Sequence, residues 1–189
     1  LRAAVLARCT LSYRRDVNPY DLACYCDWAL AEPDLDPDAL RDAPGDPYVE
    51  QRILARLPDA EVRDCLPVAV ELGRFDRSMI GPALRRRGID VDAAFSGLVG
   101  QEWVSAVTFN RDGRPAVVEI DPQLRPRLQA VLAGRPDRYP RDVDALAADL
   151  RALVETVPLP ELPVEAVEAA LRLLPVADGG VMWARLEER

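Results

Sequence analysis

The chain has 189 residues, of which 49% are hydrophobic and 30% are charged, and its formal net charge is −8. It has no histidine, and all 24 of its basic residues are arginine. This composition indicates a globular protein of one ordinary domain or two small ones, and it excludes Ser–His–Asp and Cys–His catalysis, imidazole zinc sites, P-loop phosphate binding and Schiff-base chemistry.

The sequence contains no paired-carboxylate motif either, so we expect neither an enzyme nor a cofactor or metal site. The cysteines Cys9, Cys24, Cys26 and Cys65 have no metal-ligand spacing and are interpreted as reduced thiols. The acidic net charge argues against general nucleic-acid binding. There is no signal peptide and no run of about 20 apolar residues, so we expect a cytoplasmic protein without a membrane segment. Because the chain begins at Leu1, we expect it to be a fragment of a larger protein.

The first part of the chain is predicted to contain two helices. One covers Ala3 to Tyr13, and the other starts at Asn18-Pro19, with proline in the first helical turn. Residues 32–47 combine four prolines with aspartates and are predicted to form a turn-rich connector. The first expected domain is therefore 1–47.

The middle of the chain gives the strongest local signal. Two short helices are predicted in 48–72, separated by Pro58, and a further helix is predicted over Arg74 to Arg87, ending at Gly88. Asp90 is predicted to cap a helix over Val91 to Gln101. The period then changes to that of a β-hairpin, with runs 103–109 and 116–120 around a glycine-containing turn. Helix, helix and hairpin in this order are typical of a winged helix, so the second expected domain is 48–134.

The last part, 135–189, is predicted to be a C-terminal helical region that could begin a helical repeat array. Its expected helices are 141–157 and 164–174, and they follow a helix over 123–133. Met182, Trp183 and Leu186 suggest one more helical start. The fold class is thus mainly α with a small β-hairpin, with helical segments flanking a winged-helix unit (helix-turn-helix plus wing).

The predicted winged helix has an unusual second helix. A DNA-reading helix presents Arg, Lys, Asn or Gln to base edges, but 91–101 has no basic residue and carries Asp92 in its first turn. The candidate contact residues lie elsewhere, in the run Arg85, Arg86 and Arg87 and in the wing residues Arg111 and Arg114. Three interpretations of these arginines stay open: a solvated helix end, a DNA contact, and recognition of an acidic protein surface.

Several runs of the sequence resemble the region after the nucleotide-binding core of STAND-type NTPases, the signal-transduction ATPases related to apoptotic and immune-receptor ATPases. The similar runs are YVEQRILARL at 48–57, DCLP at 64–67, LGRFD at 72–76, FSGLVGQEWVSAV at 95–107, and 118–132 with LRPRL at 124–128. The resemblance implies a switch module, in which the winged helix folds back on the nucleotide domain and holds ADP and a closed state. Release then allows oligomerisation.

The chain departs from this family in two ways. The nucleotide-binding core with its Walker motifs is absent, and the exit of the wing reads Glu119-Ile120-Asp121-Pro122-Gln123 where many members place a Met-His-Asp-like motif. Asp121 is instead predicted to be a helix N-cap. We therefore expect a non-catalytic regulatory module without a cofactor. Its expected partner is the nucleotide-binding domain of a parent protein or another protein, with homo-oligomers as an option. The alternative is a winged-helix DNA-binding transcriptional regulator.

Overall fold

The computed structural model describes residues 1–10, 17–43, 45–57, 59–134, 139–174, 180 and 184. The described chain is mainly helical, with a small three-stranded antiparallel sheet. It forms two compact units, Leu1–Leu57 and Pro58–Arg189. By its packing the segment 48–57 goes with the first unit, whereas the sequence pattern groups it with the residues that follow.

The first unit is helical throughout. Its elements are α1 (Arg2–Cys9), α2 (Pro19–Ala31), α3 (Pro37–Asp42), the π-helical η1 (Tyr48–Ile53) and the 3-10 turn η2 (Leu54–Arg56). Its core is built on three aromatic rings, those of Tyr25, Trp28 and Tyr48, whose centroids lie 5.8–6.2 Å apart. Tilted and edge-on contacts of this kind add to the stabilisation from burial.

Two predictions for this unit need correction, and one is confirmed. The first helix ends at Cys9, and residues 11–13 of the predicted span lie outside the described residues. The expected connector contains α3, because Asp36 caps the amide of Asp38 and Pro37 occupies the first helical turn. The start of α2 is confirmed, since the side chain of Asn18 accepts from the Tyr20 amide.

The second unit begins with helix, strand, two helices and two strands, and ends with further helices. The elements are α4 (Ala60–Leu72), β1 (Arg74–Phe75), α5 (Arg77–Arg86), α6 (Val91–Val99), β2 (Val104–Phe109), β3 (Pro115–Ile120), α7 (Arg125–Ala133), α8 (Tyr139–Thr156), η3 (Leu159–Glu161) and α9 (Val164–Leu173). The sheet order is β1-β3-β2 with both pairs antiparallel, and Phe75 faces Val118 while Val104 faces Ile120.

Local signals in the sequence place several of these boundaries correctly. Asp90 accepts from the amides of Asp92 and Ala93, at 2.8 and 3.0 Å, and so caps α6 as predicted. Gly88 has a φ of 70°, and its amide and that of Ile89 donate back into the end of α5, at 3.0 Å each. This pair of bonds is a Schellman motif, which favours glycine at that position. The hairpin of β2 and β3 is confirmed as well.

The predicted helix over Arg74 to Arg87 is wrong in its first turn. Arg74 and Phe75 form β1, and α5 starts only after Asp76, whose side chain accepts from the Met79 amide at 3.1 Å. Phe75 is fully buried and meets the ring of Phe95 on α6 edge-on, with 6.2 Å between centroids. The short strand therefore adds an aromatic contact between the sheet and α6.

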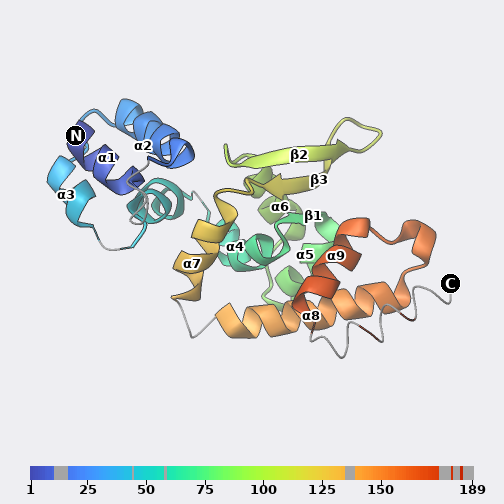
Figure 1. Cartoon of the computed structure of the whole chain (residues 1–189). Coiled ribbons are helices and arrows are strands. Elements are labelled where there is room, and N and C mark those ends of the chain that lie inside the picture. The colour runs from blue at the N-terminus through green and yellow to red at the C-terminus, as the bar shows by residue number, and fades with distance from the viewer. Residues whose placement is uncertain are drawn as a thin grey trace. The chain divides into compact units, whose positions relative to one another are not determined.

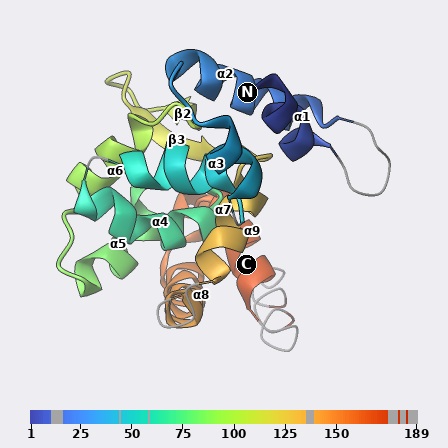
Figure 2. The same cartoon turned by 90° about the vertical axis from the view of Figure 1, so that its left-hand side faces the viewer.

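The helices of the second unit form a layer beneath the hairpin. Figures 1 and 2 show α4 and α5 between the β2–β3 hairpin and α8, and Figure 2 looks nearly along the axis of α8. The core includes Leu66, Leu84, Leu98, Leu146 and Leu150, all almost completely buried. Helices α8 and α9 thus complete the core of the α4–β3 segment.

The C-terminal part agrees with the expected helices 141–157 and 164–174, which correspond to α8 and α9. The expected helical start at Met182, Trp183 and Leu186 lies outside the described residues. Within the described part of the chain, no helix has the length and apolar character that crossing a membrane would require.

Candidate functional site

The arginines singled out from the sequence lie at two separate places on the second unit. At the end of α5, Arg85 and Arg86 are exposed and Arg87 is half-buried; in the turn between β2 and β3, Arg111 and Arg114 are exposed. The structure therefore gives solvent access to at least four of the five.

Two of the three arginines at the end of α5 form contacts within the chain. Arg86 forms an ion pair with Asp149 of α8, whose side chain is only 15% exposed. Arg87 donates from Nη1 to the backbone carbonyl of Asp64 on α4. Both contacts hold the end of α5 against neighbouring helices, which is a structural use of these cations.

The two groups are not brought together. Arg77, in the first turn of α5, donates from Nη1 to the carbonyl of Pro115, 3.2 Å away, so the start of α5 lies beside the hairpin turn. Arg86 is nine residues further along the same helix, roughly 14 Å at 1.5 Å per residue. A single continuous cationic patch from 85–87 to the hairpin turn is therefore not formed along α5.

The exposed side chains of α6 are small or acidic. Its exposed residues are Asp92, Ala93 and Ser96, and it carries no basic side chain. Arg77 reaches this helix from α5: its Nε lies 3.0 Å from Asp92 Oδ1, and its guanidinium lies 4.0 Å from the centre of the Phe95 ring. Among the described residues, the cation beside α6 is Arg77, and it is held by Asp92 and Phe95 of that helix.

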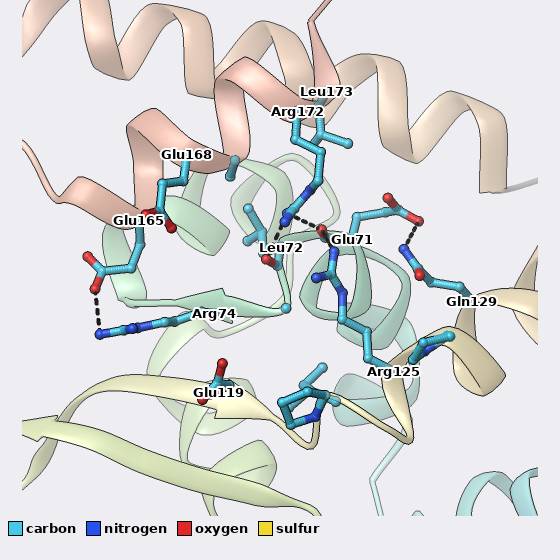
Figure 3. A pocket seen from close by; sticks show the side chains of 15 residues that line it. Glu71, Leu72, Arg74, Glu119, Arg125, Gln129, Glu165, Glu168, Arg172 and Leu173 are labelled. Atoms are coloured by element: carbon cyan, nitrogen blue, oxygen red, sulfur yellow. Dashed lines mark hydrogen bonds and ion pairs between the residues drawn. The ribbon is translucent and has the colours of Figure 1, made fainter.

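A cavity of about 620 Å³ lies where the end of α4 meets β3, α7 and α9. Its lining residues include three arginines and four glutamates, which Figure 3 labels. These residues are Glu71, Arg74, Glu119, Arg125, Glu165, Glu168 and Arg172. The charged groups alternate with apolar residues in the lining, and most of them come from elements distant in the sequence.

Two of the arginines converge on the last turn of α4. Arg125 donates to the carbonyls of Val70 and Glu71, both at 2.8 Å, and Arg172 donates to those of Glu71 and Leu72, at 2.7 and 2.9 Å. The carbonyls at a helix end have no partners within the helix and attract cations. The two guanidinium groups satisfy them, and in Figure 3 they point toward one another at Glu71.

This arrangement crowds two like charges. Desolvation lowers the pKa of Arg125, and the neighbouring charge of Arg172 lowers it further, while Glu71 and Glu119 act in the opposite direction. Glu71 is 8% exposed and its carboxylate accepts from Gln129 Nε2 at 3.2 Å. The cluster is therefore a network of charges that compensate one another inside the fold.

Gly73 lets the network form. Its φ is 72°, which ends α4, and a Cβ at this position would lie 2.6 Å from the guanidinium of Arg125. Its carbonyl also accepts from the amide of Ile120 at 2.8 Å, which ties the helix end to β3. Nearby, Arg74 pairs with Glu165 of α9 at 3.1 Å, while Arg74 Nε is buried without a hydrogen-bond partner.

The chemistry available in the described residues is limited. No group of three or more Cys, Asp or Glu side chains there is arranged to hold a metal ion. All four cysteines are free thiols, with Cys26 exposed and the others buried. Burial raises the pKa of Cys65 from 9.0 to about 12, so this thiol is not activated as a nucleophile.

Sequence reasoning did not find the cavity cluster. Arg125 and Arg172 lie 54 and 101 residues from their shared acceptor Glu71, and each looks like an ordinary surface arginine in its own helix. Only the positive φ required of Gly73 carries a local signal, because the sequence Leu72-Gly73 fits a helix end.

Comparisons with protein-family models, with curated proteins and with solved structures give no match to this chain.

Proposed function

We propose that the second unit contains a winged helix that serves as a non-catalytic, regulatory surface for contacts with another protein. The order α4-β1-α5-α6-β2-β3 and the sheet order β1-β3-β2 support the winged helix, since this fold joins a helix-turn-helix to a hairpin wing. In this assignment α5 and α6 form the helix-turn-helix, and β2 and β3 form the wing.

One observation carries the protein-contact role: the helix in the recognition position has no basic residue, and its exposed acid Asp92 is paired with Arg77. An acid on this helix would repel phosphates, whereas a protein surface can accept the small exposed side chains Ala93 and Ser96. The ion pair Arg86–Asp149 further supports a scaffold role for the end of α5.

The family expectation sharpens this proposal. From the resemblance to STAND-type NTPases, we propose that the module is an intramolecular switch whose partner is the nucleotide-binding domain of the same protein. The support for this finer statement is the sequence resemblance alone. The chain itself has no Walker motif, so saturable ATP binding by this chain would contradict the assignment.

The protein-contact role can be tested by site-specific crosslinking in producing cells. A photoreactive phenylalanine replaces Ser96 on α6 or, as a control, Asp144 on α8; both positions are exposed. We expect a defined protein adduct from position 96 only, and its loss when Ala93→Arg is added. Adducts to nucleic acid at position 96, or equal protein adducts from both positions, would contradict the proposal.

A second candidate is a winged-helix DNA-binding regulator, which the exposed Arg111 and Arg114 at the tip of the wing favour. Wing cations can contact phosphates without any base readout. Fluorescence anisotropy with a pool of labelled duplexes at low salt tests it. Binding with a steep salt dependence that is lost in the double variant Arg85→Glu plus Arg111→Glu would establish this function in place of the first.

A further inference from the structure

The cavity at the end of α4 has the size and the mixture of side chains of a small-molecule site. Its volume is about 620 Å³, and pockets for small ligands usually measure about 300–1,000 Å³. Such pockets combine apolar walls with a few polar groups that fix the orientation of the ligand. The apolar part of this lining consists of Leu72, Ile120, Pro122, Pro126, Ala169 and Leu173. The kind of ligand then depends on which charged groups of the cavity are available.

Two arginines of the cavity keep donors that the fold does not use. Arg125 bonds the carbonyls of α4 through Nε and Nη2, and Arg172 does so through Nη2. Within the described part of the chain, Nη1 of each arginine takes no part in a hydrogen bond. The two positive charges also repel one another. A carboxylate suits this pair, because guanidinium donors bind carboxylate oxygens strongly and the negative charge reduces the repulsion.

Other walls of the cavity carry carboxylates without a cation of their own. Glu165 is paired with Arg74, but the side chains of Glu119 on β3 and Glu168 on α9 have no ion pair or hydrogen bond among the described residues, as Figure 3 shows. The charge of Glu119 acts on Arg125 without an ion pair between the two side chains. These two carboxylates are therefore available to an ammonium group, which forms charge-assisted hydrogen bonds with such oxygens.

We propose that this cavity binds a small zwitterion, an α-amino acid with an apolar side chain. The carboxylate of the ligand lies at Arg125 and Arg172. Its ammonium group lies at Glu119 and Glu168, and its side chain contacts the apolar part of the lining. A ligand with a single charge fits less well, since an anion meets four glutamates and a cation meets three arginines. The proposal does not depend on the role of α6.

Thermal unfolding of the full chain in the presence of single amino acids tests the proposal. A ligand that binds only the folded state raises the midpoint of unfolding. We therefore expect leucine, isoleucine, methionine or phenylalanine to raise it in a concentration-dependent way, and glycine to do so less. Titration calorimetry then gives the dissociation constant of the most effective one. Its carboxamide lacks the negative charge and its N-acetyl form lacks the positive charge, so each should bind at least about tenfold more weakly.

A double variant, Glu119→Gln plus Glu168→Gln, assigns the binding to this cavity. It should weaken binding at least about tenfold, because charged partners of the ammonium group become neutral amides. The control Glu61→Gln removes a charge from an exposed position of α4 outside the cavity and should leave binding unchanged. Circular dichroism checks that each variant is folded.

Three results would overturn the proposal. The first is that none of these amino acids binds the unmodified chain at millimolar concentration. The second is equally tight binding of the carboxamide and N-acetyl forms, which needs no variant to fold. The third is equally tight binding by the folded double variant, because the amino acid would then bind elsewhere on the chain.

Discussion

Arg125 of α7 and Arg172 of α9 donate to the same backbone carbonyl, that of Glu71, at 2.8 and 2.7 Å. Together with their bonds to Val70 and Leu72, they replace the amide donors that the last turn of α4 lacks. The end of one helix is thereby connected to two helices that follow much later in the chain. These two arginines act as C-terminal caps, and both line the cavity at this helix end.

The cap predicts a specific loss of stability in Arg125→Ala. Its two hydrogen bonds come from a charged donor to partly buried carbonyls, so we expect a fall of about 2 to 4 kcal/mol in the free energy of unfolding. Arg125→Lys should restore little, because a single ammonium group lacks the fork of donors. Urea denaturation followed by circular dichroism measures both. Arg151→Ala is the control, since Arg151 belongs to an exposed ion pair with Glu155 and should cost below about 1 kcal/mol.

The contrast with Asp90 shows what sequence reasoning can find. A cap made by an aspartate two or three residues before its amides is a local pattern, and so are the proline at the start of α2 and the glycine after α5. The hairpin is equally local. The cap made by Arg125 is not local, because its acceptors are more than 50 residues away and any arginine on a helix surface has the same sequence context.

Two misjudged elements have the same kind of cause. The strand β1 has two residues, too few for a period of two, and Phe75 also fits the apolar face of a helix. Helix α3 was not predicted because the segment 32–47 is rich in proline. Pro37, however, lies in the first helical turn, where a helix tolerates proline. Both elements also have contacts from elsewhere in the chain: Phe75 packs on Phe95, and Arg8 donates to the carbonyl of Leu40 at 2.8 Å in α3.

The local cap of α6 gives a second prediction. Asp90→Ala removes two hydrogen bonds to backbone amides at the helix start, and we expect a loss of about 1 kcal/mol in the free energy of unfolding. Asn at the same position should keep most of the stability, because its side-chain oxygen can accept the same bonds. Asp112→Ala in the exposed hairpin turn is the charge-matched control. An equal loss in both variants would show that net charge, and not capping, is responsible.

The close contact between α4 and α6 gives a third prediction, at Gly97. A Cβ there would lie 2.4 Å from Cγ2 of Val62, a buried and β-branched side chain that cannot move aside easily. Gly97→Ala should therefore destabilise the unit by about 1 to 3 kcal/mol, despite the better helix propensity of alanine.

Gly100, at the end of the same helix, is the control: its φ is −72° and a Cβ would be 3.5 Å from its nearest neighbour. Gly100→Ala should be neutral or slightly stabilising. Thermal denaturation of the two variants gives the comparison, and a stable Gly97→Ala protein would mean that the two helices pack less closely.

The last prediction concerns alkaline pH and Cys65. This thiol is 1% exposed, and its Sγ donates to the carbonyl of Val62 at 3.2 Å. Burial raises its pKa from 9.0 to about 12, so between these values the unfolded chain loses the proton while the folded chain keeps it. The contribution of Cys65 to the free energy of unfolding is fully present below pH 9 and decreases as the pH rises toward 12, by about 1.4 kcal/mol per pH unit.

Chemical denaturation between pH 8 and 10.5 should therefore show that the unmodified chain loses about 2 kcal/mol more than Cys65→Ala does. Because both proteins have the same tyrosines, which ordinarily ionise near this pH range, taking the difference cancels their contribution to the pH dependence. Cys26→Ser is the control for the removal of a thiol from an exposed position. Parallel curves for the unmodified chain and Cys65→Ala would mean that the folded thiol ionises near its ordinary pKa, and that the α4 core admits water at Cys65.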